Sequence, residues 1–373
     1  MAAAGLRLTD RRASAGLEPS AAEPCDPNGL QSIWYITRKF PPSRGGMQRL
    51  SARIAGELGA LRPLTLVRWN RGQWGLPLFV AWALLRLCAG LLRGRGRVLL
   101  LGDPVLSLLA LPARWAGVPV AVVVHGLDIA YPHRGYPAYL RRFFWGRFDL
   151  YFCISRYVRD RLVGAGIEPA RCALVHPGVD GMDASDAPPA GPPRLLILGR
   201  LVPRKGALWF VETVMPALPP AIVLDIVGEG PQRAALERAI AQYGLRERVR
   251  LWGDVDESEK ARRLAACDLA LMPNRRVDGD PEGFGLVALE AAMSGRYVLA
   301  ADLEGLRDAV SDAALGRLLP EADAPAWIVA IADLLGDRAA LRERGRAARA
   351  HALAHCSWRG MAQAYAERLD ALG

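Results

Sequence analysis

Short apolar runs alternate along the chain with longer segments in which apolar residues recur every three or four positions. In the first half, the runs are short and rich in β-branched residues, as buried strands are. They cover 31–37, 98–101, 118–124, 151–154 and 173–175, and a helical pattern over 47–61 follows the first run. Strands that alternate with helices are typical of βαβ units, so we predict a parallel sheet.

The same alternation begins again after residues 181–193, which are rich in small residues and proline and have the composition of a linker. Here we predict strands at 194–198, 222–227, 250–252, 269–272 and 297–300. Helices are expected over 206–217, from 232, 257 and 285, and over a final region from 325 to 372. The pattern therefore predicts an α/β protein with two Rossmann-like domains, at 29–180 and 194–356.

The first 28 residues lack any periodicity and are rich in Ala, Pro, Arg and acidic residues. We interpret 1–28 as a flexible N-terminal extension, because it has too few apolar residues to build a core. It lacks the short apolar core of a secretory signal, and the six cysteines form no CxxC pair. We therefore expect a cytoplasmic protein without a zinc or redox motif.

The apolar segment Leu76–Leu92 has three interpretations. As a helix its 17 residues would extend over about 26 Å, just short of the apolar core of a membrane. We favour a helix buried against the sheet, because Arg86 at its middle makes a membrane span costly. The second interpretation is a helix in the membrane interface, which nearby aromatic and basic residues would suit: Trp69, Trp74, Trp82, Arg93, Arg95 and Arg97. A membrane span is the third.

The charge is unevenly distributed along the chain. The 373 residues are 51% hydrophobic and 23% charged, which excludes a wholly disordered protein, and their formal net charge is +10. Residues 1–180 carry 24 basic and 11 acidic groups, whereas 181–373 carry 24 and 27. The positive first half predicts an anionic partner such as a membrane or a phosphorylated substrate. We expect no nucleic-acid partner, because no recognised module is present and the aromatic residues lie in apolar runs.

Two glycine-rich turns follow predicted strands. Gly45 and Gly46 precede the first helix, where glycine lets the backbone N–H groups approach a phosphate closely. Gly228 and Gly230 begin like a dinucleotide-binding fingerprint, but Arg233 stands where its third glycine would be. A tight turn remains the alternative for the first pair, and we interpret the second as a close-packed turn near a nucleotide.

Basic residues also stand at predicted strand ends. His125 follows the strand at 118–124, where ligands bind in open α/β sheets, although a single histidine is often structural. Arg200 and Lys205 follow the strand at 194–198 and suit a diphosphate. Lys205 is one of only three lysines among 48 basic residues, so a compact ammonium group matters there. A solvated basic turn is the alternative.

The most informative segment runs from Glu282 to Glu290. These acids are eight residues apart, with Gly283, Gly285 and a predicted helix start between them. The rise between two helical residues at that spacing is about 12 Å, whereas the carboxylates of a retaining glycosidase lie about 5 Å apart. We therefore predict that they recognise separate hydroxyl-bearing parts of one ligand. Plain helix capping by acidic residues is the alternative.

Two DxD strings could hold a divalent metal, at Asp254–Asp256 and Asp278–Asp280. Both stand in short polar loops, where aspartate commonly forms turns. We therefore predict that no metal is required.

Taken in order, these motifs resemble those of the retaining glycosyltransferases of family GT4, over residues 31–373. The resemblance rests on FPPSRGGMQ (40–48), HGLD (125–128), CISRYV (153–158), HPGVD (176–180), RLVPRKG (200–206) and EGFGLVALEAAMSG (282–295). It implies the GT-B fold, in which two Rossmann-like domains face each other across a cleft. It also implies that a C-terminal helix, 357–373, returns to the first domain. The first motif looks like that of bacterial enzymes with lipid-linked or phosphorylated acceptors, including phosphatidylinositol mannosyltransferases.

The resemblance also implies roles for single residues. Glu290 would bind the donor ribose, and Glu282 the donor sugar together with Gly283, Phe284, Gly285 and Leu286. Arg200 and Lys205 would neutralise the diphosphate near Gly46, and His125 would contact the transferred sugar. The chain departs from the family at Arg296, where proline is usual, and at Glu304–Gly305, where a glycine pair is usual. The rim of the nucleotide pocket is therefore expected to differ.

The implied reaction moves a hexosyl group from a nucleotide-diphosphate sugar, GDP- or UDP-linked, to an acceptor hydroxyl with retention. The implied reaction needs no cofactor besides this donor. The oxygen of the departing phosphate would accept the proton of the acceptor hydroxyl. The acceptor would be anionic or lipid-linked, with peripheral contact to the inner face of an anionic membrane. Alternatives on the same fold are a nucleotide-sugar epimerase and a non-catalytic nucleotide-sugar-binding protein.

Overall fold

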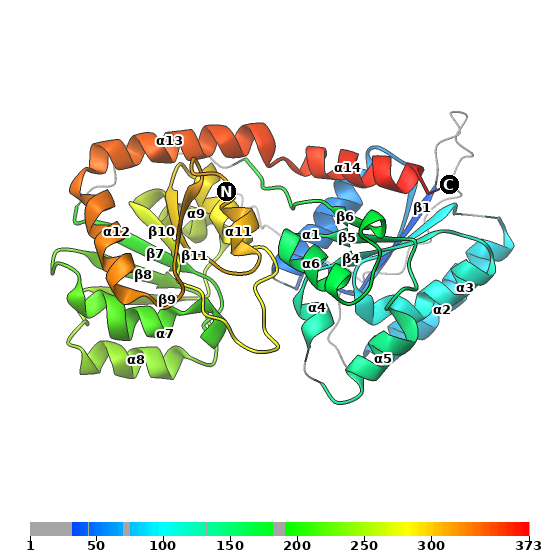
Figure 1. Cartoon of the computed structure of the whole chain (residues 1–373), viewed down its shortest axis with the longest axis horizontal. Coiled ribbons are helices and arrows are strands. Elements are labelled where there is room, and N and C mark those ends of the chain that lie inside the picture. The colour runs from blue at the N-terminus through cyan, green and yellow to red at the C-terminus, as the bar shows by residue number, and fades with distance from the viewer. Residues whose placement is uncertain are drawn as a thin grey trace, which may run out of the picture. The chain divides into compact units, whose positions relative to one another are not determined.

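The computed structural model describes residues 32–43, 45–69, 75–94, 96–131, 133–181 and 191–372. The predicted extension 1–28 and most of the predicted linker lie outside the described residues. The domain boundaries proposed above therefore stay predictions. Two six-stranded parallel sheets are present, and we call each sheet with its helices a lobe (Figure 1).

The sheet of the first lobe has the strand order β2-β1-β3-β4-β5-β6. Its strands are β1 (Ile33–Thr37), β2 (Leu64–Arg68), β3 (Val98–Leu101), β4 (Val120–Val124), β5 (Leu150–Cys153) and β6 (Cys172–Leu174). Its helices are α1 (Gly46–Arg53), α2 (Leu76–Leu92), α3 (Ala110–Trp115), α4 (Leu127–Ala130), α5 (Tyr136–Phe143) and α6 (Arg156–Gly164). A π-helical turn, η1 (Ile54–Leu58), extends α1, and the 3-10 helices are η3 (Pro104–Leu109) and η4 (Pro169–Arg171).

The sheet of the second lobe has the order β12-β11-β10-β7-β8-β9. Its strands are β7 (Arg194–Leu198), β8 (Val223–Val227), β9 (Val249–Gly253), β10 (Leu269–Met272), β11 (Tyr297–Ala301) and β12 (Gly316–Leu319). Its helices include η5 (Pro203–Lys205), α7 (Ala207–Trp209), η6 (Phe210–Val214), η7 (Met215–Ala217), α8 (Arg233–Gln242), α9 (Glu257–Ala266), α10 (Leu286–Met293) and α11 (Leu306–Ala309). The last three helices of the chain are α12 (Ala324–Gly336), α13 (Arg338–His355) and α14 (Trp358–Asp370).

The predicted α/β class and parallel sheets are confirmed, and the predicted strands agree with the observed ones to within about two residues at their ends. Strands β1, β3, β4 and β5 are buried along their whole length. Helices cover both faces of such a sheet, which is why these strands appear in the sequence as continuous apolar runs.

Two strands were not predicted from the sequence, β2 and β12, and both lie at an edge of a sheet. Their burial is mixed, with Arg68 and Arg317 exposed. An edge strand with one partly exposed face has no continuous apolar run. The predicted helical region over 325–372 consists of three helices, because Asp337 and Ser357 cap new helix starts.

The last helix, α14, returns to the first lobe as predicted. The ring of Tyr365 stacks on Phe152 of β5, with centroids 4.0 Å apart. Arg62 Nε donates to the Asp370 carboxylate at 3.2 Å. The backbone N–H of Val179 also donates to the carbonyl of Cys356 at 2.9 Å, which joins the end of the first lobe to the start of this helix.

Helix α2 is buried on one face only. Phe79, Ala83 and Leu87 are buried against the core, and Gly90 lies so close to Trp34 that a Cβ atom would come within 2.3 Å of its ring. The prediction of a core helix is therefore right for that face, whereas Leu85 on the opposite face is 71% exposed. Within the described parts of the chain, no helix has both the length and the apolar character that crossing a membrane requires.

Candidate functional site

The predicted site residues follow the carboxyl ends of strands in both sheets. In the second lobe, Arg200 follows β7, Gly228 follows β8 and Glu282 lies between β10 and α10. In the first lobe, His125 follows β4, and Gly45 lies between β1 and α1. The carboxyl ends of all strands in a parallel sheet lie on the same side of the sheet. The site residues of each lobe therefore lie together on that side.

Glu282 is surrounded by cations. Its Oε2 atom accepts hydrogen bonds from Lys205 Nζ at 2.5 Å and Asn274 Nδ2 at 2.7 Å, and from Arg204. Burial raises the pKa of this carboxyl, but the charges of Lys205 and Arg204 outweigh burial and lower the pKa to about 2. Glu282 is therefore ionised at neutral pH and suits hydrogen bonding to hydroxyl groups rather than proton donation.

Arg204 was not singled out from the sequence. Its side chain is only 7% exposed, and its Nε donates to Asp280 at 3.1 Å while another nitrogen bonds Glu282. The only signal was its position next to Lys205 in the basic turn. Asp280, from the second DxD string, is thus engaged by a guanidinium group.

Glu304 and Gly305, where the chain departs from the glycine pair of the family pattern, both hold Glu282. The Glu304 carboxylate accepts the backbone N–H of Glu282 at 2.6 Å, and the N–H of Gly305 donates to the Glu282 carbonyl at 3.1 Å. Glu304 has a φ of 47°, a conformation that is uncommon for a residue with a side chain. The loop after β11 therefore fixes the backbone of the loop before α10.

The glycine loop before α10 contacts the first lobe. A Cβ atom on Gly283 would lie 2.0 Å from the carbonyl oxygen of His125, so only glycine allows this approach. Gly285 has a φ of 100° and caps α10, and Phe284 lies 5.5 Å from the His176 ring, between centroids. Leu286 packs against Gly46. The predicted donor-binding loops of the two lobes thus meet.

Glu290 lies deeper and is 5% exposed. Its Oε1 atom accepts a hydrogen bond from Lys260 Nζ at 3.2 Å and another from Arg49 of α1. Arg49 also donates to Asp180 at 2.9 Å. Glu282 and Glu290 therefore have separate sets of cations, and Arg49 and Lys260 were not singled out from the sequence.

The remaining glycines hold turns together. Gly45 has a φ of 146° and precedes α1 directly. A Cβ atom on Gly228 would meet the carbonyl oxygen of Gly199 at 2.0 Å, and one on Gly230 would meet that of Leu201 at 2.5 Å. These two glycines therefore allow the turns after β7 and β8 to pack together. This packing role does not depend on a nucleotide.

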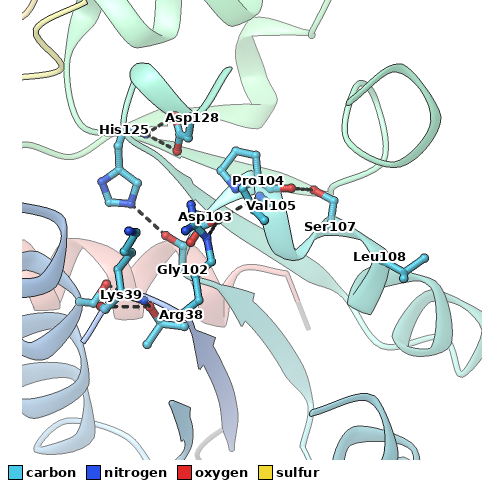
Figure 2. Close-up of polar contacts among 12 residues, drawn as sticks. Arg38, Lys39, Gly102, Asp103, Pro104, Val105, Ser107, Leu108, His125 and Asp128 are labelled. Atoms are coloured by element: carbon cyan, nitrogen blue, oxygen red, sulfur yellow. Dashed lines mark hydrogen bonds and ion pairs between the residues drawn. The ribbon is translucent and has the colours of Figure 1, made fainter. Parts of the chain in front are cut away.

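His125 is held firmly at the end of β4 (Figure 2). Its Nε2 atom lies 2.9 Å from the carbonyl oxygen of Gly102, to which it donates. The carboxylate of Asp128 accepts the backbone N–H of His125 at 2.9 Å. Burial raises the pKa of Asp128 to about 6 despite the nearby His125.

A cavity of about 880 Å³ lies between the lobes. Its lining includes Arg156, Tyr157 and Arg161 from α6, with Glu304, Arg307 and Asp308 from around α11. It contains none of the predicted site residues, although Glu304 connects it to Glu282.

No group of three or more His, Cys, Asp or Glu side chains converges as a metal site would in the described segments. Asp256 instead caps α9, where it accepts the Glu259 N–H at 2.7 Å.

Both lobes match models of known protein families. A family model described as Glycosyltransferase Family 4 matches residues 43–181, and one described as Glycosyl transferases group 1 matches 192–337. The GDP-mannose-dependent alpha-(1-6)-phosphatidylinositol monomannoside mannosyltransferase of Mycolicibacterium smegmatis is 28% identical, over 90% of this chain and 97% of its own.

Solved structures share the fold. Sucrose-phosphate synthase from Thermosynechococcus elongatus superposes with a TM-score of 0.74 at 20% identity, over 92% of this chain and 99% of its own. Anabaena HepE in complex with UDP and glucose has a TM-score of 0.71 at 20% identity, over 91% and 100%. These structures show that the chain has the GT-B fold. Because the two glycosyltransferase family models match one lobe each, the chain belongs to glycosyltransferase family 4 and is a glycosyltransferase.

Proposed function

We propose that this enzyme transfers a hexosyl group, with retention of configuration and without a metal, from a GDP- or UDP-linked sugar to an acceptor hydroxyl. The observation that carries the proposal is the ionised Glu282, whose side chain is 12% exposed and is held by Lys205, Arg204 and Asn274 just before α10. A fixed acceptor of hydrogen bonds beside a basic turn suits a sugar that is linked to a diphosphate. The similarity to a GDP-mannose-dependent relative and to a UDP-bound structure supports this donor class.

The proposed chemistry depends on the charge of the leaving diphosphate. Arg200 is exposed at the end of β7, and together with Lys205 and the N–H groups at the start of α10 it would stabilise the negative charge that develops there. The leaving phosphate oxygen would take the proton of the acceptor hydroxyl while the new glycosidic bond forms on the same face. His125 and Glu282 would orient the sugar, and closure of the lobes would exclude water.

The other proposed donor contacts come from both lobes. Glu290 would bind the ribose hydroxyls, with Lys260 and Arg49 fixing its carboxylate. The loop of Gly283, Phe284, Gly285 and Leu286 would contact the sugar, while Gly45, Gly46, Gly228 and Gly230 would line the phosphates and the nucleoside.

The donor proposal is tested with a panel of UDP-, GDP- and ADP-hexoses, scored for transfer and hydrolysis. Glu282→Gln and Glu290→Ala should each lower turnover by about a hundredfold or more, because each removes a placed contact to the reacting donor. Glu247→Gln is the matched control, since Glu247 is exposed. Full turnover in both site variants would remove the site assignment, and an epimerised nucleotide sugar formed without acceptor would replace transfer by epimerisation.

We also propose that the acceptor is anionic or lipid-linked and that the enzyme binds the surface of an anionic membrane. An apolar stripe runs along the outer face of α2, where Leu78, Leu85 and Leu92 are 75%, 71% and 89% exposed. Residues at this spacing share one face of a helix. Trp115 of α3 is 84% exposed as well, and α2 packs against α3.

Basic residues accompany this stripe. The exposed side chains of Arg86 and Arg93 lie on or next to α2, and Arg114 lies beside Trp115. Apolar side chains flanked by arginine suit the boundary between headgroups and acyl chains of an anionic bilayer. The M. smegmatis relative is named as a phosphatidylinositol monomannoside mannosyltransferase, which agrees with such a surface.

The membrane proposal is tested by sedimentation with phosphatidylcholine vesicles with or without an anionic lipid. The wild type should bind only the anionic vesicles, and binding should weaken with salt. Leu78→Ser/Leu85→Ser should lose most of this binding. Val329→Ser/Leu353→Ser is the matched control, because these residues are also exposed, at 68% and 53%, but lie on α12 and α13. Equal binding by both double variants would refute the assignment to α2.

A further inference from the structure

Lys39 stands just after the end of β1. It is half-buried, and within the described residues its ammonium group makes no hydrogen bond or ion pair. Burial lowers its pKa, and the positive charges of Arg38 and Arg200 lower it further, although Asp103 acts in the opposite direction. Partial burial of an unpaired cation costs free energy, so such a group indicates a ligand that would compensate it.

One oxygen of the nearby Asp103 carboxylate, Oδ1, is already engaged. Arg38 Nε donates to Asp103 Oδ1 at 3.0 Å, and the same oxygen accepts the backbone N–H of Val105 at 2.9 Å. Asp103 is fully buried, which fixes the Arg38 guanidinium beside Lys39. Figure 2 shows Arg38 reaching Asp103 while the side chain of Lys39 extends toward His125.

The other two lysines of the chain behave differently. Lys205 bonds Glu282 at 2.5 Å, and Lys260 bonds Glu290 at 3.2 Å. Both are therefore compensated by a glutamate. Lys39 instead lies where the charges of Arg38 and Arg200 reach it from the ends of β1 and β7. Among the charges that act on Lys39, two are positive, those of Arg38 and Arg200, and one is negative, that of Asp103.

We propose that Lys39, supported by Arg38 and Arg200, binds a phosphate group in the substrate complex. A phosphate presents several oxygens to the three donors of an ammonium group, and its negative charge would form the ion pair that Lys39 lacks among the described residues. Two sources have this chemistry: the diphosphate of the donor and a phosphate on the acceptor. The choice between them rests on the proposed function, whereas phosphate binding by Lys39 does not.

The test measures binding to the full-length protein by calorimetry, with UDP, GDP, uridine and guanosine as one set of probes. Inorganic phosphate, titrated into protein saturated with the nucleoside diphosphate, is the other. If Lys39 binds the donor, Lys39→Gln should weaken diphosphate binding about tenfold or more while nucleoside binding stays unchanged. If it binds an acceptor phosphate, only the phosphate titration should weaken by that factor. Lys39→Arg should restore most of either affinity.

The control is Arg359→Gln, which removes one exposed positive charge on α14 and should leave both affinities unchanged. Equal affinities of Lys39→Gln and the wild type in both titrations would overturn the inference. If the wild type binds neither UDP nor GDP, the proposed function fails instead. The phosphate titration of unloaded protein then tests Lys39 alone: a tenfold weaker affinity in Lys39→Gln supports the inference, and an equal one overturns it.

Discussion

Two buried carboxyl groups of this enzyme have pKa values displaced in opposite directions, because their neighbours differ. Glu282 faces Lys205 and Arg204, and its pKa falls to about 2 in spite of burial. For Asp128, burial outweighs the effect of the nearby His125 and raises the pKa to about 6. We therefore expect the contributions of the two residues to the free energy of unfolding to change in opposite directions with pH.

For Glu282 the folded-state pKa lies below its ordinary value of 4.5. Its contribution to stability is therefore fully present above pH 4.5 and is lost as the pH falls toward 2. At pH 7, Glu282→Gln should lower the free energy of unfolding by about 3 kcal/mol, because it leaves buried cations unpaired. Denaturant titrations at pH 7 and at pH 3 should show a smaller cost at the lower pH. An equal cost at both would contradict the assigned ion pairs.

For Asp128 the folded-state pKa lies above its ordinary value of 3.8. The stability that this group contributes is present below pH 3.8 and is lost as the pH rises through 6. The wild type should thus lose up to about 3 kcal/mol relative to Asp128→Asn between pH 3.8 and pH 7. Parallel denaturant titrations of the two proteins measure the change. A difference in stability that does not vary with pH would show that Asp128 is not desolvated.

At the scale of elements, the sequence predicts the strands that are buried on both faces. It does not predict edge strands, whose burial depends on the neighbouring elements of the fold. Strands β3 and β10 were predicted with their observed bounds, because each is an uninterrupted apolar run. Strand β2 was missed, because its exposed Arg68 and partly buried neighbours interrupt the run.

The same limit applies to the site. The segment from Glu282 to Glu290 was recognisable from its local spacing. The pairing of Arg49 with Glu290 was not, because these residues are 241 positions apart and lie on helices of different lobes, α1 and α10. Arg204 stood within a recognised motif, but its burial depends on the fold of the β10–α10 loop. Whether the site residues bind the donor as proposed stays a prediction.

Helix α13 makes a close contact that a single methyl group can test. A Cβ atom on Gly345 would lie 2.1 Å from the carbonyl oxygen of Gly295, just after α10. Gly345→Ala should therefore lower the free energy of unfolding by about 2 kcal/mol, since the backbone there has no room to move. Gly336→Ala, at the end of α12, meets no atom within 4 Å and should be neutral or stabilising by up to about 1 kcal/mol. Similar unfolding free energies of the two variants in denaturant would refute the contact.

At the scale of the whole molecule, the contacts between the lobes surround the proposed donor site. Gly283 lies against the backbone of His125, and Arg49 reaches across to Glu290. Asp308 of α11 is a third contact: it accepts the backbone N–H and the Nε–H of Arg156 at 3.0 Å each, and lies 3.0 Å from His176 Nε2. Since α11 directly follows the Glu304–Gly305 turn that holds Glu282, the interlobe contact and the proposed sugar-binding loop form one connected unit.

Asp308 therefore offers a test of whether closure of the lobes supports transfer. Its side chain is 1% exposed, and although burial raises its pKa, His176 and Arg156 lower it below the ordinary value, so it carries a charge at neutral pH. Asp308→Ala should lower kcat/KM about tenfold, because the loop that positions Glu282 loses its anchor on the first lobe. The radius of gyration of the unliganded protein in X-ray scattering should also increase. Asp302→Ala removes an exposed pair with Arg307 in the same loop, at 2.6 Å, and should change neither quantity. Equal kinetics and equal scattering for the two variants would show that the contact through Asp308 does not govern the site.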